Sequence, residues 1–243
     1  MPHAPDTPLE SLPPIGLAEL DACAALRHRV DVKYVASLPV LEALAAELSA
    51  THRALELDGR RSFAYATTYY DTADLRCYRE HVQGRRRRFK VRVRHYVDAG
   101  VTVAEVKRAG PRGETVKERV PLPAPGAALP ACLEEGAALR PVLAMRFRRT
   151  TLVAPERGER LTCDVELAFA APGGGAGRLV AGAVILESKS RTGVALADGV
   201  LRALGVRPVR GCSKYCLGIA ATRAGVPTNP FRPLLRRHFE ALA

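Results

Sequence analysis

Apolar and polar residues alternate with a period of two over much of this chain, which is the pattern of β-strands with one buried face. Eight segments with this alternation predict strands near residues 29–36, 62–70, 86–97, 101–109, 115–121, 145–154, 160–169 and 179–189. The short spacing between the segments is typical of hairpins. It therefore favours an antiparallel barrel or sandwich.

A second pattern, with apolar residues three and four positions apart, predicts helices between and after the strands. Ser37 is placed to cap the helix predicted over 40–48, and Pro39 lies in its first turn. The helical segments are 17–26, 40–48, 74–81, 194–204, 213–224 and 233–242. We expect a flexible leader over 1–26, one main domain over 27–224 and a helical tail over 225–243.

Charged residues gather on one face of the predicted strands, because successive side chains of a strand point to opposite sides. The charged faces are Arg88, Lys90, Arg92 and Arg94 (against Phe89, Val91 and Val93); Arg29, Asp31 and Lys33; Glu105 and Lys107; Lys117 and Arg119; Arg160, Asp164 and Glu166; and Glu187 and Lys189. A solvent-facing sheet would explain any one of these strands. The whole set is harder to explain in this way. A solvent-facing sheet mixes Ser, Thr, Gln, Glu and Lys, whereas these faces contain mainly cations with a few single carboxylates among them.

The overall charge agrees with an anionic partner. The chain has 37 Lys and Arg against 25 Asp and Glu, a formal net charge of +12. Cations that line a barrel interior are costly to bury unless a polyanion, water and a divalent metal accompany them. A nucleic acid is not expected as the partner, because the basic strands lack interleaved aromatic residues and contain carboxylates. The run 85–88, four arginines, is either an exterior patch or a solvated hairpin end.

The sequence gives two further expectations. It has neither an apolar run of roughly 20 residues nor a secretory signal, so we expect a cytoplasmic protein. Its six cysteines are scattered. Cys212 and Cys216, four positions apart in a predicted helix, could serve a metal or redox role, but small buried thiols in a reducing compartment are the favoured interpretation.

In their order along residues 29–218, these features resemble the VTC domain, the polyphosphate-polymerase domain of the triphosphate tunnel metalloenzyme (CYTH-like) superfamily. The matching stretches are Val32-Lys33-Tyr34, Tyr70-Asp71-Thr72, His81 to Tyr96, Glu105-Val106-Lys107, Val116-Lys117-Glu118-Arg119, Arg149-Thr150, Arg160 to Leu167, Leu186-Glu187-Ser188-Lys189 and Ser213-Lys214-Tyr215. The resemblance implies an α+β fold, a closed antiparallel eight-stranded β-barrel (the tunnel) with flanking helices.

The resemblance also implies a function: transfer of the γ-phosphoryl group of ATP to a polyphosphate chain, with Mn²⁺ or Mg²⁺ as cofactor. The implied catalytic cations are Lys33, Arg92, Arg94, Lys107 and Lys117. The implied substrate-binding cations are Lys90, Arg119, Arg149, Arg160, Lys189 and Lys214. The implied metal ligand is Glu187, with Glu105, Asp164 and Glu166 as further candidates. ATP, triphosphate and polyphosphate are the implied ligands, and any partner for chain export is a separate protein, such as a membrane protein.

Two departures from the family pattern bear on this interpretation. Many superfamily members open with Glu-x-Glu-x-Lys, where this chain has Arg29, Asp31 and Lys33. The missing first carboxylate argues against the triphosphatase and cyclase branches. Gly211 stands where the polymerase branch tends to carry an additional lysine. The alternatives that stay open are a non-catalytic polyphosphate- or triphosphate-binding protein and a tunnel-fold triphosphatase.

Overall fold

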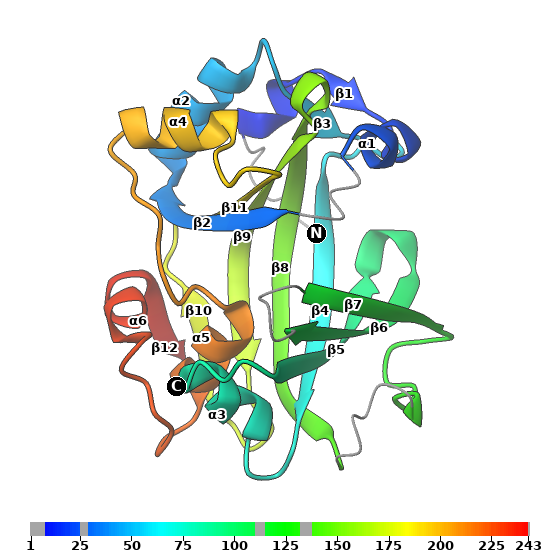
Figure 1. The fold of residues 1–243 in the computed structure, drawn as a ribbon, viewed down its shortest axis with the longest axis vertical. Helices are drawn as coiled ribbons and strands as arrows, with labels where there is room; N and C mark the ends of the chain where they lie inside the picture. Colours follow the sequence, from blue (N-terminus) through cyan, green and yellow to red (C-terminus); the bar gives the residue numbers. More distant parts are fainter. Residues whose placement is uncertain (1–7, 25–28, 110–114, 132–137, 243) are drawn as a thin grey trace. The chain divides into compact units, whose positions relative to one another are not determined.

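The structure is a computed structural model that describes residues 8–24, 29–109, 115–131 and 138–242 (Figure 1). Over these residues the helices are α1 (Leu17–Cys23), α2 (Leu38–Leu48), α3 (Arg76–Val82), α4 (Leu196–Ala203), α5 (Lys214–Thr222) and α6 (Arg232–His238). The strands are β1 (Pro14–Ile15), β2 (Val30–Ser37), β3 (Arg53–Leu55), β4 (Ser62–Asp71), β5 (Arg88–Tyr96), β6 (Val101–Ala109), β7 (Thr115–Leu122), β8 (Arg140–Ala154), β9 (Glu159–Ala170), β10 (Ala176–Leu179), β11 (Ala183–Ser190) and β12 (Phe239–Leu242). Short 3₁₀ turns cover Pro8–Ser11, Val97–Ala99 and Pro155–Arg157.

Within the described chain the strands form one large sheet whose pairing runs β12-β10-β9-β8-β4-β5-β6-β7. Off this path, β11 pairs with β9 and β2, and β3 pairs with β8 and β1. The β1–β3 pair is parallel, and the other pairs with a determined register are antiparallel. The predicted α+β class with a large antiparallel sheet and flanking helices is confirmed. The closed eight-stranded barrel is not shown, because the path ends at β7 and β12 instead of returning on itself.

All eight predicted strand segments contain a strand, but the short strands β1, β3 and β12 escaped prediction. A strand of two to four residues places only one or two side chains on each face, which is too few to show alternation. The prediction was wrong at the C-terminal helix, which ends at His238, and it missed most of β10, which begins at Ala176. Phe239–Leu242 pairs with β10 instead of continuing the helix.

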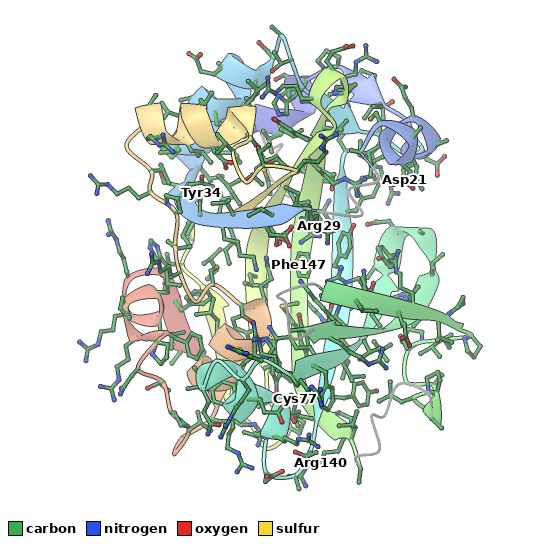
Figure 2. All side chains as sticks on the ribbon, viewed as in Figure 1. Asp21, Arg29, Tyr34, Cys77, Arg140 and Phe147 are labelled. Carbon is green, nitrogen blue, oxygen red and sulfur yellow. The ribbon has the colours of Figure 1, made fainter. Side chains whose placement is uncertain are left out.

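The chain divides into two compact units, and the first comprises residues 1–63, 148–166 and 181–210. Its core lies where α2 and α4 pack on one face of β2 and β11 (Figure 1). Buried Asp198 of α4 accepts hydrogen bonds from Tyr34 Oη (2.8 Å; labelled in Figure 2) and Ser188 Oγ (2.5 Å). Because side chains alternate along a strand, this packing leaves Lys33 and Glu187 on the opposite face of the same strands.

The second unit comprises residues 64–147, 167–180 and 211–243. Its strands β4, β5, β6 and β7 pair in sequence order as a meander. Asp71, which is fully buried at the end of β4, accepts hydrogen bonds from the Cys77 (2.8 Å) and Tyr78 (3.1 Å) amides of α3 and from the Tyr215 hydroxyl of α5. This carboxylate therefore ties both helices to the sheet and fixes the position of Lys214.

Two sequence expectations concern the chain as a whole. Among the residues described, no helix combines the length and the apolar character needed to cross a bilayer. Cys77, Cys163, Cys212 and Cys216 are buried thiols, which agrees with the favoured interpretation of the cysteines. Cys132 lies outside the described residues.

Candidate functional site

The predicted site residues form two groups, one in each unit. We name them after their central carboxylates. The Glu105 cluster consists of Arg92, Glu105, Lys117 and Arg119 on β5, β6 and β7. The Glu187 cluster consists of Lys33, Glu187 and Lys189 on β2 and β11.

The Glu105 cluster is built by strand register. Arg92 and Arg119 stand directly opposite Glu105 on the two neighbouring strands. Arg92 Nε lies 2.6 Å from Glu105 Oε2, and Arg119 Nε lies 2.9 Å from Oε1. Lys117 Nζ also pairs with Oε1. Three cations thus share one carboxylate that is only 2% exposed.

The electrostatics of the cluster follow from this arrangement. Burial opposes ionisation of Glu105, but Arg92, Lys117 and Arg94 outweigh it and hold the pKa of the carboxyl well below its usual range. Burial also lowers the pKa of Lys117 to about 8, against the attraction of Glu105. Glu105 is therefore an anion at neutral pH, and it serves as counter-ion to its cationic neighbours.

The next row of the same face contains only cations. Lys90, Lys107 and Lys117 stand directly opposite one another across β5, β6 and β7. Like charges at directly opposed positions destabilise a sheet. A row of three lysines is therefore expected where an anion binds and compensates the repulsion.

Other predicted cations of this unit lie beside the same strands. Lys90 Nζ donates to Ser213 Oγ at 3.0 Å. Arg94 is buried, with its guanidinium carbon 5.3 Å from the centre of the Tyr65 ring and 5.9 Å from that of Phe147. Lys214 Nζ lies 5.8 Å from the same Phe147 ring, labelled in Figure 2. Aromatic faces thus orient two cations without neutralising their charge.

The Glu187 cluster has a different charge pattern, in which acid and base alternate. Lys33 faces Glu187 across β2 and β11, and in the next row Asp31 faces Lys189. Glu187 Oε1 lies 3.1 Å from Lys189 Nζ, and its Oε2 lies 4.0 Å from Lys33 Nζ. Burial lowers the pKa of Lys189 to about 8, although Glu187 opposes the shift. Arg29, labelled in Figure 2, pairs with Asp31 at 2.9 Å.

The remaining predicted site residues of the first unit, Arg149, Arg160, Asp164 and Glu166, are not members of the Glu187 cluster. Arg149 makes a bidentate pair with buried Asp164, at 2.6 and 2.8 Å. Arg160 donates to the Ala24 carbonyl at 2.9 Å and pairs with Asp21 at 3.3 Å (Figure 2), so it is directed at α1. Glu166 is exposed and has a positive φ of 55°.

One neighbour of the Glu105 cluster escaped the sequence prediction. Tyr69 stands opposite Arg92 across β4 and β5, and Arg92 Nη1 donates to its hydroxyl at 3.5 Å. Tyr69 thus continues the row of Arg92, Glu105 and Arg119 onto a fourth strand. Nothing in the local sequence marks this tyrosine, because its place depends on the register of β4 against β5.

Comparison with known proteins identifies the family. A family model of the VTC domain matches residues 28–128 and 131–223. The chain belongs to the VTC domain family. The predicted resemblance to the VTC domain is thereby confirmed. No curated protein matches this VTC domain.

One solved structure shows the same fold at low sequence identity. A putative adenylyl cyclase from Hippeastrum, described as having a dominant triphosphatase activity, aligns with a TM-score of 0.51 and 14% identity over 81% of this chain and 98% of its own. A putative adenylate cyclase from Vibrio parahaemolyticus aligns with a TM-score of 0.44 and 15% identity, over 84% of this chain and 98% of its own.

The family implies a divalent metal, and the donor set fits one only in part. In the described chain, no three His, Cys, Asp or Glu side chains converge into a ready-made site. Glu105 is surrounded by cations, and both oxygens of Asp164 accept from Arg149. The pairs of Glu187, at 3.1 Å to Lys189 and 4.0 Å to Lys33, are longer than those of Glu105 and Asp164. The Glu187 oxygens suit a hard ion that takes its other ligands from water and substrate phosphates, as Mg²⁺ does.

Proposed function

We propose that this VTC domain is a metal-dependent phosphotransferase that moves the γ-phosphoryl group of ATP onto a polyphosphate chain. The observation that carries the proposal is the cationic face of β5, β6 and β7, where a row of three lysines lies beside a row with two arginines on one carboxylate. No other common biological ligand matches closely spaced like charges as well as a chain of phosphates does.

The reaction needs no covalent nucleophile on the protein. The bond between the γ-phosphorus and the β,γ-bridging oxygen breaks, ADP leaves, and the terminal phosphate oxygen of the chain forms the new bond to the γ-phosphorus. Phosphoryl transfer of this kind depends on positioning and on neutralising charge. Lys33, Arg92, Arg94, Lys107 and Lys117 have this role in the proposal. The cations proposed to hold the substrate are Lys90, Arg119, Arg149, Arg160, Lys189 and Lys214.

Glu187 is the proposed metal ligand, because the family resemblance assigns it that role and its pairs with Lys189 (3.1 Å) and Lys33 (4.0 Å) are longer than those of Glu105 and Asp164. A bound Mn²⁺ or Mg²⁺ would neutralise charge on the phosphate oxygens. Glu105 and Asp164 are less suited, since cations already occupy their oxygens. The closed tunnel barrel, the main domain over 27–224, the cytoplasmic location and a separate membrane partner for export stay predictions within this proposal.

The test is an assay of purified protein with γ-labelled ATP and either Mn²⁺ or Mg²⁺. We expect label in long, acid-insoluble phosphate chains that a gel resolves, together with stoichiometric ADP. The matched control for the metal ligand is Glu156→Gln, which removes an exposed carboxylate of the same unit. It should leave synthesis unchanged, whereas Glu187→Gln should abolish it.

Two other results would select the alternatives. Label released only as orthophosphate or short phosphates would identify a triphosphatase, the activity named for the Hippeastrum neighbour. Tight binding of polyphosphate with no turnover under either metal would identify a non-catalytic binding protein.

A further inference from the structure

A second concentration of positive charge lies outside the two clusters. The turn that joins α3 to β5 borders a hollow of about 700 Å³, and five of the side chains that line it are arginines. They are Arg76, Arg79, Arg85, Arg86 and Arg87, and we call this hollow the α3 arginine pocket. All five belong to the second unit.

The backbone holds the arginine run in a defined conformation. At the end of α3 the Arg85 amide donates to the Glu80 carbonyl (2.9 Å), and the Gly84 amide donates to the His81 carbonyl (3.2 Å). These two bonds form a Schellman motif, and Gly84 has the positive φ, 65°, that the motif requires. The helix ending therefore sets the direction in which the chain leaves α3, and Arg86 and Arg87 follow it in a bend before β5.

The charge of the pocket is only partly compensated. Arg76 pairs with Glu80 at 2.9 Å, and Arg79 pairs with Asp74. Arg85 donates to the Gln83 side chain at 3.0 Å, which carries no charge. Arg86 and Arg87 are exposed, and neither has a carboxylate partner within the described residues. Five arginines against two carboxylates leave three positive charges at one hollow.

The chemistry of the lining selects the ligand. The two lining residues besides the arginines are Glu80 and Gln83, so the pocket offers no aromatic face on which a nucleobase could stack and no aliphatic surface for a lipid chain. Guanidinium groups bind phosphate oxygens in pairs. A volume of about 700 Å³ is larger than one phosphate group needs. These features fit a linear chain of phosphates.

The pocket also leads directly into the strand that carries the proposed phosphate contacts. Arg88 follows the arginine run as the first residue of β5, and its Nη1 donates to the Arg85 carbonyl at 2.6 Å. Arg88 lies on the same face of β5 as Lys90 and Arg92, because alternate residues share a face. Cations thus continue from the pocket along the strand to the Glu105 cluster.

We propose that the α3 arginine pocket is a second binding site for polyphosphate, one that holds phosphates of the chain beyond those bound at the Glu105 cluster. The choice of ligand in this inference rests on the proposed function. The inference goes beyond that function by locating the site that binds the part of a long chain away from its reacting end. A short oligophosphate would be bound at the cluster alone, whereas a long chain would engage both places.

The test compares two double variants that remove the same charge. Arg86→Ala with Arg87→Ala removes two of the three arginines of the pocket that have no carboxylate partner within the described residues. Arg236→Ala with Arg237→Ala removes two exposed arginines of α6 and serves as the matched control. Calorimetry would measure the affinity of each full-length variant for tripolyphosphate and for long-chain polyphosphate, and melting temperatures would confirm folding.

We expect the pocket variant to bind long-chain polyphosphate about tenfold or more weakly and tripolyphosphate within about twofold of the unaltered protein. The control variant should change neither affinity by more than about twofold. Equal loss of long-chain affinity in both variants would show a general charge effect and overturn the proposal, as would no loss in either. Equal loss for tripolyphosphate and for the long chain in the pocket variant would also overturn a separate site.

Two further probes decide the class of partner. Duplex DNA and phosphatidylserine vesicles are offered to the same variants. If the pocket variant lost affinity for either of these and kept its affinity for long-chain polyphosphate, the proposal would be wrong. The proposed function can fail independently: selective loss of long-chain binding in a protein that transfers no phosphoryl group would leave the pocket established and the enzyme refuted.

Discussion

The Glu105 and Glu187 clusters use the same residue types and differ in how strand register mixes them. Around Glu105, three cations share one carboxylate, and one of them, Lys117, also stands in the adjacent row with Lys90 and Lys107. Around Glu187, the rows of β2 and β11 pair Lys33 with Glu187 and Asp31 with Lys189, and Arg160 of β9 stands opposite Lys189. The first face therefore has the larger excess of positive charge, whereas acids and bases are more evenly matched on the second.

Under the proposed function, the two clusters would have different tasks. The face with more positive charge would bind the phosphate chain, and Glu187 would bind the metal ion. We therefore expect Glu105 to matter mainly for stability and Glu187 mainly for turnover. Four predictions test this contrast, in order of decreasing effect.

Replacing Glu187 should have the largest effect, on turnover. Glu187→Gln should lower ATP-dependent chain synthesis by more than about a hundredfold, because it removes the proposed metal ligand. Polyphosphate affinity should stay the same or rise, because Lys33 and Lys189 lose the carboxylate that otherwise competes with phosphate oxygens for their ammonium groups. Turnover and calorimetric affinity would be measured on the same preparation. Equal loss of both would mean that Glu187 is structural.

Replacing Glu105 should mainly affect stability. Glu105→Gln leaves three cations without their counter-ion, and we expect a loss of about 2–3 kcal/mol in the free energy of unfolding. Tripolyphosphate should restore much of this loss, because it binds only the folded protein. Urea unfolding with and without the ligand measures both quantities.

The control for Glu105 is Glu118→Gln on the other face of the meander, which breaks an exposed pair with Arg108 (2.6 Å). It should cost less than about 1 kcal/mol. If Glu105→Gln were equally mild, Glu105 would not be the counter-ion of the cluster.

Replacing one arginine of the charged face should mainly affect binding. Arg92→Ala and Arg94→Ala should each weaken triphosphate binding by about 1.5–3 kcal/mol, the range for a hydrogen bond to a charged group. Both variants should fold, because Lys117 and Arg119 still pair with Glu105 and one cation fewer reduces the repulsion on this face. Arg108→Ala, on the opposite face, is the matched control. Triphosphate affinity would be measured by calorimetry. An unchanged affinity in the Arg92 and Arg94 variants would show that these arginines do not bind phosphate.

The smallest predicted effect is a change in the titration of one histidine. Burial lowers the pKa of His81 to about 3, and Lys90, Arg88 and Lys107 add to the shift. An anion bound at the lysine row should neutralise part of that influence, so the pKa of His81 should rise towards its ordinary value near 6.5. NMR of the imidazole resonances, with and without tripolyphosphate, would measure it.

His52 of the first unit is the internal control. Burial lowers its pKa to about 4, and its one charged neighbour is Glu159, so the ligand should leave it unchanged. An equal change at both histidines would contradict binding at the lysine row. Since both folded pKa values lie below 6.5, the stability that each histidine contributes is complete above that pH and is lost as the pH falls towards 3 to 4.

The sequence was sufficient to predict the faces of the strands. Along β5, Phe89, Val91 and Val93 are buried, whereas Arg88, Lys90 and Arg92 on the alternate positions stay partly exposed. The family could also be predicted, because its motifs are local and keep their order along the chain. Both predictions depend only on residues that are close together in the sequence.

The contacts of Arg160 could not be predicted from the residues around it in the sequence. Its parity groups it with Asp164, but its guanidinium reaches Asp21 and the Ala24 carbonyl. The segment that receives it is more than a hundred residues earlier, in a stretch that we expected to be a flexible leader. No pattern within β9 could indicate that contact.

Which residues of each strand share the apolar face and which share the charged face follows from the order of residues alone, because the pleat of a strand repeats every two residues whatever it pairs with. Which charges stand opposite one another depends on how the strands pair in the folded chain. A shift of one residue in the register of β6 would separate Glu105 from Arg92 and Arg119 and turn its side chain to the other face. Register is set by pairing between distant segments, so the charge excess at one cluster and the balance at the other exist only in the folded protein.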